Sequence, residues 1–218
     1  MKTPEANFFG YSTSGRSGYS LIEFMVSSMI LLIISAALFG IMSDVQRTAS
    51  SQAEMQSILN NAQVALQTIG RYIRQAGNNP LGGSLAAIII GSPSEVHIQS
   101  DLTGSLSPGN PDKGDPDGDI NDSGENVAIR HNQAARTIEV VPDGGPAQIL
   151  AGNISGFSLL YYDADGNAAG KGEDVSRIRV IIRAASLLPN PQTSQPFALE
   201  ISSDIQLAAW QPDSNQII

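Results

Sequence analysis

The stretch Gly18-Tyr19-Ser20-Leu21-Ile22-Glu23 leads directly into an apolar run, Phe24 to Met42, that has nineteen residues and no charge. About 20 consecutive apolar residues are needed to cross the hydrocarbon core of a bilayer. A secretory signal has a shorter apolar region of about 7–15 residues, and its small-residue cleavage site follows that region. Here the small residue Gly18 precedes the run, so cleavage there would leave the apolar segment attached. The stretch therefore predicts a membrane helix.

Glu23 places a carboxylate at the edge of this predicted membrane helix. An unpaired carboxylate in such a segment costs about 2–3 kcal/mol or more, which makes it a candidate functional group. If the chain were cut after Gly18, the new α-amine of Tyr19 would lie about one helical turn from Glu23, close enough to neutralise it. The amine of a neighbouring subunit could serve equally well.

The sequence Gly-Tyr-Ser-Leu-Ile-Glu-Phe-Met at residues 18–25, with its apolar continuation, resembles the type III signal of type IV prepilins and pseudopilins. In that family a membrane aspartyl peptidase, the prepilin peptidase, cuts after the glycine and methylates the new N-terminus. The resemblance implies that Gly18 is the cut-site residue, Tyr19 the methylated N-terminus and Glu23 the acid used in assembly. Tyr19 departs from the phenylalanine usual in the family. The alternative is a plain signal anchor in which the glutamate is incidental.

The charge balance of the chain is acidic, with a formal net charge of −9. Such a balance repels phosphate backbones, so we do not expect direct nucleic-acid binding. Lys2 and Arg16 precede the apolar run, which favours a cytoplasmic N-terminus and an exported acidic portion. The chain contains no cysteine, and therefore lacks the disulfide that staples the C-terminal loop of many major pilins.

A long helix is predicted to continue beyond the membrane run, because no proline occurs from Tyr19 to Ala76. Past the run, apolar residues recur at spacings of three and four and predict one apolar stripe: Met55, Leu59, Ala62, Leu66, Ile69 and Ile73. Gly77 and Pro80 are helix-stop signals. A helix of about 57 residues would be ~85 Å long. We expect a domain to pack along the stripe in its second half.

The end of this predicted helix, Ala65 to Asn78, resembles the corresponding segment of PilW-like minor pilins. In those proteins an apolar helix face leads into an Ile-Arg-x-Ala-Gly stop, written here Ile73-Arg74-Gln75-Ala76-Gly77. This resemblance points to the PilW group of minor pilins, which is related to the J-type minor pseudopilins of type II secretion.

After Pro80 the pattern changes to short segments with a period of two, bounded by Gly, Pro, Asn or Asp. A helix followed by strands predicts an α+β fold, in which a long N-terminal helix packs on an antiparallel sheet, as in pilins. We expect a leader at 1–18, a transmembrane and assembly helix at 19–43, an amphipathic continuation at 44–79 and a β-rich ectodomain at 80–218. The predicted strands are 95–99, 126–130, 137–141, 156–162, 174–182 and 197–203.

An acidic loop between two predicted strands suggests a metal site, because oxygen donors at alternate positions can converge on one cation. The candidate calcium ligands are Asp115, Asp117, Asp119, Asn121, Asp122 and Glu125. Ile120 stands where an EF-hand loop needs glycine, and Asn126 where it needs a bidentate acid, so an EF-hand is excluded. An irregular calcium loop and a solvated acidic turn both remain open. The second Asp-rich segment, 163–167, reads as turn chemistry between strands.

The sequence offers little support for catalysis. His97 and His131 lack the spacing of a catalytic triad or a metal-ligand set, and surface or packing roles fit them better. We therefore expect no enzyme and no obligate cofactor.

The function implied by the resemblance is that of a minor pilin. It would be a single-pass protein of the inner membrane, with its ectodomain in the periplasm or outside, before it enters a type IV pilus. It would meet other minor and major pilins through the N-terminal helices and help to prime fibre assembly or form the tip; motility and adhesion follow from the fibre. The alternatives are a J-type pseudopilin of type II secretion and a calcium-dependent adhesin on a membrane stalk.

Overall fold

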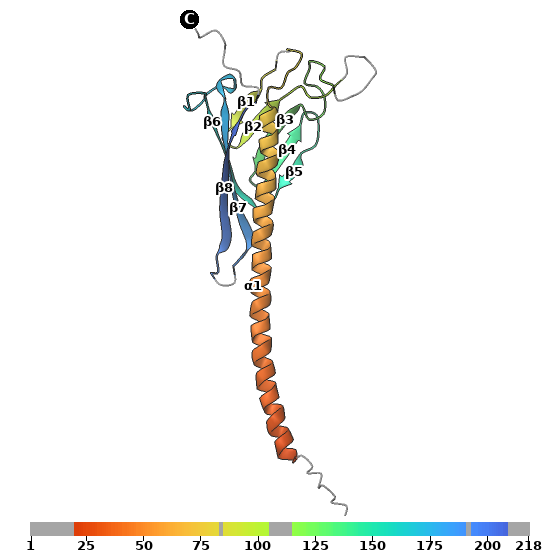
Figure 1. Ribbon diagram of the computed structural model, residues 1–218, viewed down its shortest axis with the longest axis vertical. Coiled ribbons are helices and arrows are strands. Elements are labelled where there is room, and N and C mark those ends of the chain that lie inside the picture. The colour runs from red at the N-terminus through yellow and green to blue at the C-terminus, as the bar shows by residue number, and fades with distance from the viewer. Residues whose placement is uncertain (1–19, 83–84, 105–114, 191–192, 209–218) are drawn as a thin grey trace, which may run out of the picture. The chain divides into compact units, whose positions relative to one another are not determined.

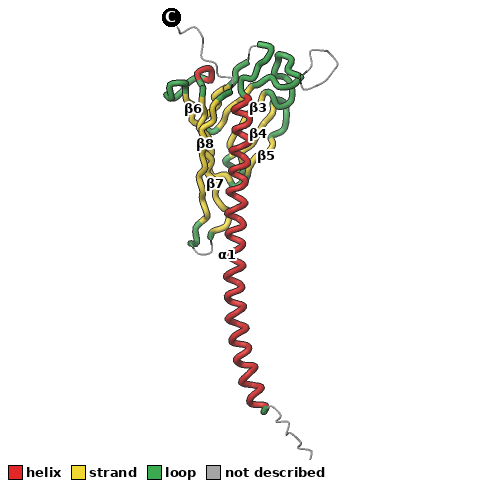
Figure 2. Tube along the Cα trace, in the orientation of Figure 1, coloured by secondary structure: helices red, strands yellow, loops and turns green. Residues whose placement is uncertain are grey.

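The computed structural model describes residues 20–82, 85–104, 115–190 and 193–208. The chain divides into two compact units, Met1–Arg47 and Thr48–Ile218. One helix, α1 (Leu21–Gln75), runs through the boundary between them. The strands follow the helix in sequence, so the predicted α+β class is confirmed (Figures 1 and 2).

The bounds of α1 agree with the stop signals in the sequence. The Ser20 carbonyl accepts hydrogen bonds from the amides of Glu23 (2.9 Å) and Phe24 (3.1 Å), which closes the first turn. At the other end Gly77 has φ 77°, the left-handed conformation that glycine adopts without a steric penalty. The amide of Gly77 then donates to the carbonyl of Gln99 (2.9 Å), which ties the helix end to a strand.

The first unit presents the apolar part of α1. Between Leu21 and Val45 its large apolar side chains are 51–77% exposed. A core helix of a soluble protein would bury such residues, whereas none of the most apolar window of α1 is buried. By length and composition α1 can cross a membrane, as the sequence predicted.

The second unit contains the end of α1 and two antiparallel sheets. The first sheet is a meander of five strands in sequence order: β1 (Ile88–Ser92), β2 (Glu95–Gln99), β3 (Asn126–Asn132), β4 (Thr137–Pro142) and β5 (Gln148–Ala151). The second has three: β6 (Ile154–Tyr162), β7 (Arg177–Pro189) and β8 (Pro196–Gln206). A short 3-10 helix, η1 (Gly172–Asp174), precedes β7.

Two points of the predicted strand pattern were wrong. We expected one sheet, but the strands form two. β1 and β5 were not predicted, because β1 has consecutive apolar residues instead of an alternating pattern and β5 has only four residues. The other six strands lie where the period-two segments placed them, although β7 begins at Arg177 because Asp174 belongs to η1.

The core of the second unit combines the helix with both sheets. On β2 and β3 alternate residues are buried, so each strand turns one face inward. The buried positions of α1 belong to the same apolar cluster as those of the two sheets. From the helix these are Ile58, Ala62, Ala65, Ile69, Ile73 and Ala76.

The apolar stripe on α1 was predicted in a partly wrong phase. Ala62, Ile69 and Ile73 are fully buried as expected, but Met55 is 41% exposed and Leu59 37% exposed. Ile58 takes the buried place instead, with 1% exposure. Gly70 is also buried, and a Cβ there would lie 3.3 Å from Cδ1 of Ile205 on β8, so this glycine allows a close approach between helix and sheet.

Backbone hydrogen bonds join the two sheets near Arg136 and Asn153. The amide of Ile154 donates to the Arg136 carbonyl (2.9 Å), and the amide of Ala185 donates to the Asn153 carbonyl (2.9 Å). Both Arg136 (φ 54°) and Asn153 (φ 61°) adopt left-handed backbone conformations, which non-glycine residues seldom do. The Arg136 guanidinium also donates to the carbonyl of Ala185 (3.2 Å), so the junction is held by side chain and main chain together.

Candidate functional site

The first candidate site is the start of α1, where Glu23 lies in the first helical turn. Exposed apolar neighbours flank it, Ile22 at 70% and Phe24 at 71% exposure. A carboxylate in this turn interacts favourably with the positive end of the helix dipole. The predicted processing residues Gly18 and Tyr19 lie outside the described residues. The proposed pairing of the Tyr19 amine with Glu23 therefore remains a prediction.

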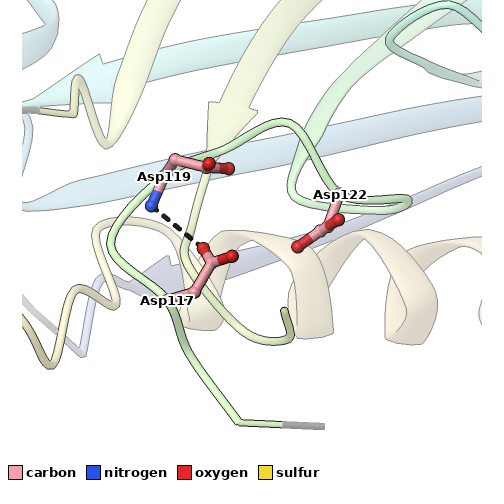
Figure 3. A group of neighbouring side chains, drawn as sticks. All are labelled: Asp117, Asp119 and Asp122. Carbon is pink, nitrogen blue, oxygen red and sulfur yellow. Dashed lines mark hydrogen bonds between the residues drawn. The ribbon is translucent and has the colours of Figure 1, made fainter. Parts of the chain in front are cut away.

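The second candidate site is the acidic loop between β2 and β3. The structure brings the carboxylates of Asp117, Asp119 and Asp122 together, with one oxygen from each within 4.8 Å of the others (Figure 3). Hydrogen bonds shape the loop: the amide of Asp119 donates to Oδ1 of Asp117 (3.2 Å), and the amide of Asn121 donates to Oδ1 of Asp119 (2.9 Å). Carboxylate oxygens of this kind are the ligands that calcium and magnesium prefer.

The remaining predicted ligands lie outside this group of three. Asp115 and Asn121 are exposed. Glu125 is fully buried, and its Oε1 accepts hydrogen bonds from the amides of Leu102 (2.6 Å) and Thr103 (2.8 Å). Its second oxygen, Oε2, is buried and has no hydrogen-bond partner within the part of the chain that the structure describes. Each carboxylate oxygen can accept two hydrogen bonds, so this carboxylate is only half satisfied.

Sequence reasoning missed two residues of the loop, Asp101 and Gly104. Asp101 is fully buried; its Oδ1 accepts from the amide of Asp117 (3.2 Å) and its Oδ2 from the amide of Gly118 (3.0 Å). Gly104 has φ 148°, and a Cβ there would lie 2.5 Å from Oδ2 of Asp117 and 2.7 Å from Oδ2 of Asp122. Both residues are more than ten positions from the acidic run, and only the fold brings them to it.

The segment 163–167 has the turn chemistry that the sequence predicted. The amide of Asp163 donates to the carbonyl of Asn167 (2.9 Å), and the amide of Asn167 donates back to Oδ1 of Asp163 (2.8 Å). Gly166 supplies the left-handed residue with φ 87°. These bonds account for the Asp163 carboxylate as part of a turn.

The buried carboxylate of Glu139 on β4 accepts hydrogen bonds from several side chains. Glu139 is 7% exposed and accepts hydrogen bonds from Asn132 (2.8 Å), Arg130 (3.2 Å) and Thr137 (3.2 Å). The hydrogen bond from Asn132 is the largest cause of a lowered pKa for Glu139; burial opposes it, and Arg130 and Thr137 lower the pKa further. These three partners lie on β3 and β4, so the hydrogen bonds of Glu139 join the two neighbouring strands.

A row of cross-strand side-chain pairs, here called the arginine ladder, lies on β6, β7 and β8. The Arg177 guanidinium stacks 4.7 Å from the centre of the Tyr162 ring. Arg179 holds Asp204 through two hydrogen bonds (2.7 and 2.8 Å), and these bonds lower the pKa of the Asp204 carboxyl. Arg183 pairs with Glu200 (2.6 Å). Each arginine of the ladder thus has a neighbouring carboxylate or ring on an adjacent strand.

The two histidines occupy ordinary positions. Nε2 of His97 lies 3.2 Å from Oε1 of Glu95 on the same strand, and Nε2 of His131 lies 3.4 Å from the carbonyl of Ile154. Within the described residues, the one group of three or more acidic, histidine or cysteine side chains placed to share a metal ion is that of Asp117, Asp119 and Asp122. The candidate sites therefore reduce to the start of α1 and the acidic loop.

Comparison of the chain with models of known protein families gives no match, and neither does comparison with curated proteins.

Proposed function

We propose that this protein is a pilin-like subunit of a type IV pilus, most like the PilW group of minor pilins. The observation that carries the proposal is the division of one helix between two environments. The same α1 exposes an apolar surface in its first part and contributes buried side chains to a β-rich domain in its second part.

The exposed apolar surface needs a cover. Burying one large apolar side chain is worth about 1.5–3 kcal/mol. Sixteen such side chains of α1 between Leu21 and Val45 are more than half exposed, so covering them would contribute on the order of tens of kcal/mol. A bilayer provides this cover before assembly. In a filament, the helices of neighbouring subunits provide it.

Glu23 gives such an assembly a preferred register. An unpaired carboxylate among apolar helices is costly, and a cation near it removes much of that cost. Cleavage after Gly18 would create the required cation, the amine of Tyr19, at the start of each helix. A subunit would therefore enter a filament with its Glu23 beside the amine of an adjacent subunit.

Processing is tested by mass spectrometry of the chain purified from the membranes of its own host. We expect a mature protein that begins with N-methylated Tyr19, and Gly18→Ala should leave the leader attached. An unprocessed N-terminus, or one that begins at another residue, would refute the proposal.

Assembly is tested by replacing Glu23 with glutamine, which keeps the size of the side chain but removes its charge. Glu23→Gln should still be cleaved and remain in the membrane, yet be depleted from sheared pili. Glu54→Gln is the matched control, because Glu54 lies on the same helix beyond the apolar run. If both variants enter pili like the wild type, Glu23 has no role in assembly.

The pilus and the secretion pseudopilus are separated by deleting the chain in its host. We expect deletion to reduce surface pili and leave type II secretion intact. Normal pili together with a loss of secreted proteins would favour the J-type pseudopilin instead.

A further inference from the structure

We propose that the acidic loop between β2 and β3 binds one calcium ion, with Asp117, Asp119 and Asp122 as its carboxylate ligands and with the buried carboxylate of Glu125 in the same loop. This inference is independent of the pilin proposal. It depends on three features of the loop: the spacing of the three carboxylates, the burial of the Glu125 carboxylate, and the space that Gly104 leaves for Asp117 and Asp122.

The spacing of the three carboxylates suits calcium. Calcium binds oxygen at 2.3–2.6 Å, so two oxygens of one coordination shell lie at most about 5 Å apart. One oxygen from each of Asp117, Asp119 and Asp122 lies within 4.8 Å of the other two, and Figure 3 shows the three side chains. Magnesium needs near-ideal octahedral geometry at about 2.0–2.1 Å and gives up its water reluctantly, so an irregular loop of this kind favours calcium.

Glu125 supplies the second, independent observation. Its carboxylate is fully buried and reaches the backbone of residues 102 and 103, because Oε1 accepts from the amides of Leu102 and Thr103. The next residue along that backbone, Gly104, is the one against which the carboxylates of Asp117 and Asp122 pack. Among the described residues Oε2 of Glu125 has no hydrogen-bond partner. A buried carboxylate oxygen without a partner is costly, and a cation bound in the loop would offset that cost.

The absence of a side chain at Gly104 leaves room for two carboxylates of the proposed ion site. A side chain at this position would overlap the carboxylates of both Asp117 and Asp122, and the φ of 148° also favours glycine. The buried Asp101 fixes the same part of the loop by accepting the amides of Asp117 and Gly118. The backbone that carries the Asp117 carboxylate is thus held by hydrogen bonds within the loop.

Backbone carbonyls and water molecules would complete the coordination shell of the ion. Three carboxylates offer up to six oxygens, and calcium takes six to eight oxygen ligands that include backbone carbonyls and water. Oδ1 of Asp117 and Oδ1 of Asp119 each accept one backbone amide. A carboxylate oxygen has two lone pairs, so the bond that Oδ1 of Asp119 accepts leaves one lone pair for a metal ion.

Calorimetric titration of the full chain in detergent micelles with calcium chloride tests the site directly. We expect saturable binding of one calcium ion per chain, with a Kd on the order of 10⁻⁴–10⁻³ M, as in extracellular calcium modules. Magnesium chloride at the same concentrations should bind at least about tenfold more weakly. Calcium should also raise the thermal unfolding temperature, and chelation should reverse this shift.

Two asparagine variants distinguish a specific site from general attraction of calcium to an acidic surface. Asp119→Asn removes a ligand charge and should weaken binding at least about tenfold. Asp115→Asn removes the same charge from an exposed position of the same loop, outside the group of three, and should bind calcium like the wild type. Asp117→Asn provides a second ligand variant if Asp119→Asn fails to fold.

Either of two outcomes overturns the inference. One is a folded wild-type chain that shows neither saturable heat nor a thermal shift with calcium. The other is an equal loss of affinity in Asp115→Asn and in the ligand variants, which would indicate diffuse electrostatic attraction. Neither outcome bears on processing at Gly18 or on the role of Glu23, so the pilin proposal is judged separately.

Discussion

Replacing Ile58 with alanine tests which face of α1 packs against the sheets. Ile58 is 1% exposed, whereas its neighbour Leu59 is 37% exposed. Ile58→Ala removes three carbon atoms from the core. At about 0.8 kcal/mol per buried carbon group the transfer loss is ~2.4 kcal/mol, and the cavity left behind brings the total to about 2.5–4 kcal/mol. In a domain of this size, 1 kcal/mol corresponds to a change of about 2–4 °C in unfolding temperature. We therefore expect a decrease of about 5–15 °C.

Leu59→Ala is the matched control for this substitution. It removes the same number of carbon atoms one residue further along the helix, and alanine and leucine have similar helix propensities. We expect its stability to change by less than about 1 kcal/mol. Near-ultraviolet circular dichroism of the full chain in micelles is a suitable assay, because it reports the packing of buried tyrosines such as Tyr161, which is 9% exposed. Equal destabilisation by both variants, or a larger effect of Leu59→Ala, would refute the assigned helix face.

Three further predictions concern the second unit. The pKa of Glu139 is lowered in the folded protein, so the stabilisation from this carboxylate is present above pH about 4.3 and is lost as the pH falls through the folded pKa. Glu139→Gln should therefore lower the free energy of unfolding by about 1–3 kcal/mol at pH 7. In urea titrations it should also flatten the acid dependence of stability. Gly172→Ala should cost about 1–3 kcal/mol in the same assay, because its Cβ would overlap the carbonyl of Ile88. A double-mutant cycle on Arg179 and Asp204 should give a coupling much smaller than the effect of Glu139→Gln, because this ion pair is exposed to solvent.

A control variant or a contrary outcome would test each of these three predictions. For Glu139, unchanged stability at pH 7 together with an unchanged acid slope would show that its hydrogen bonds contribute nothing. Gly170→Ala is the control for Gly172, because a Cβ there meets nothing within 4 Å. For the ion pair, a coupling as large as the effect of Glu139→Gln would show that solvent screens it less than its exposure suggests.

The sequence by itself determined the features that depend on local chemistry. The uncharged run after Glu23 and the absence of proline predicted a helix long enough to cross a membrane, and Gly77 marked its end to within two residues. Strands with strict alternation were also found: β2 lies at the predicted residues, since a strand with one buried face has a period of two. The acidic run identified three carboxylates that the structure places together.

Only the tertiary structure decided which surfaces meet. Ile58 and Leu59 are equally apolar, and only contact with the sheets determines which of them is buried. β1 carries consecutive isoleucines that favour no face until β2 pairs with it, and the separation of β6, β7 and β8 into a second sheet depends on contacts between distant segments. Asp101 and Gly104 join the acidic loop in the same way. Local sequence patterns report the periodicity of one segment, whereas these choices depend on the shape of whichever segment packs against it.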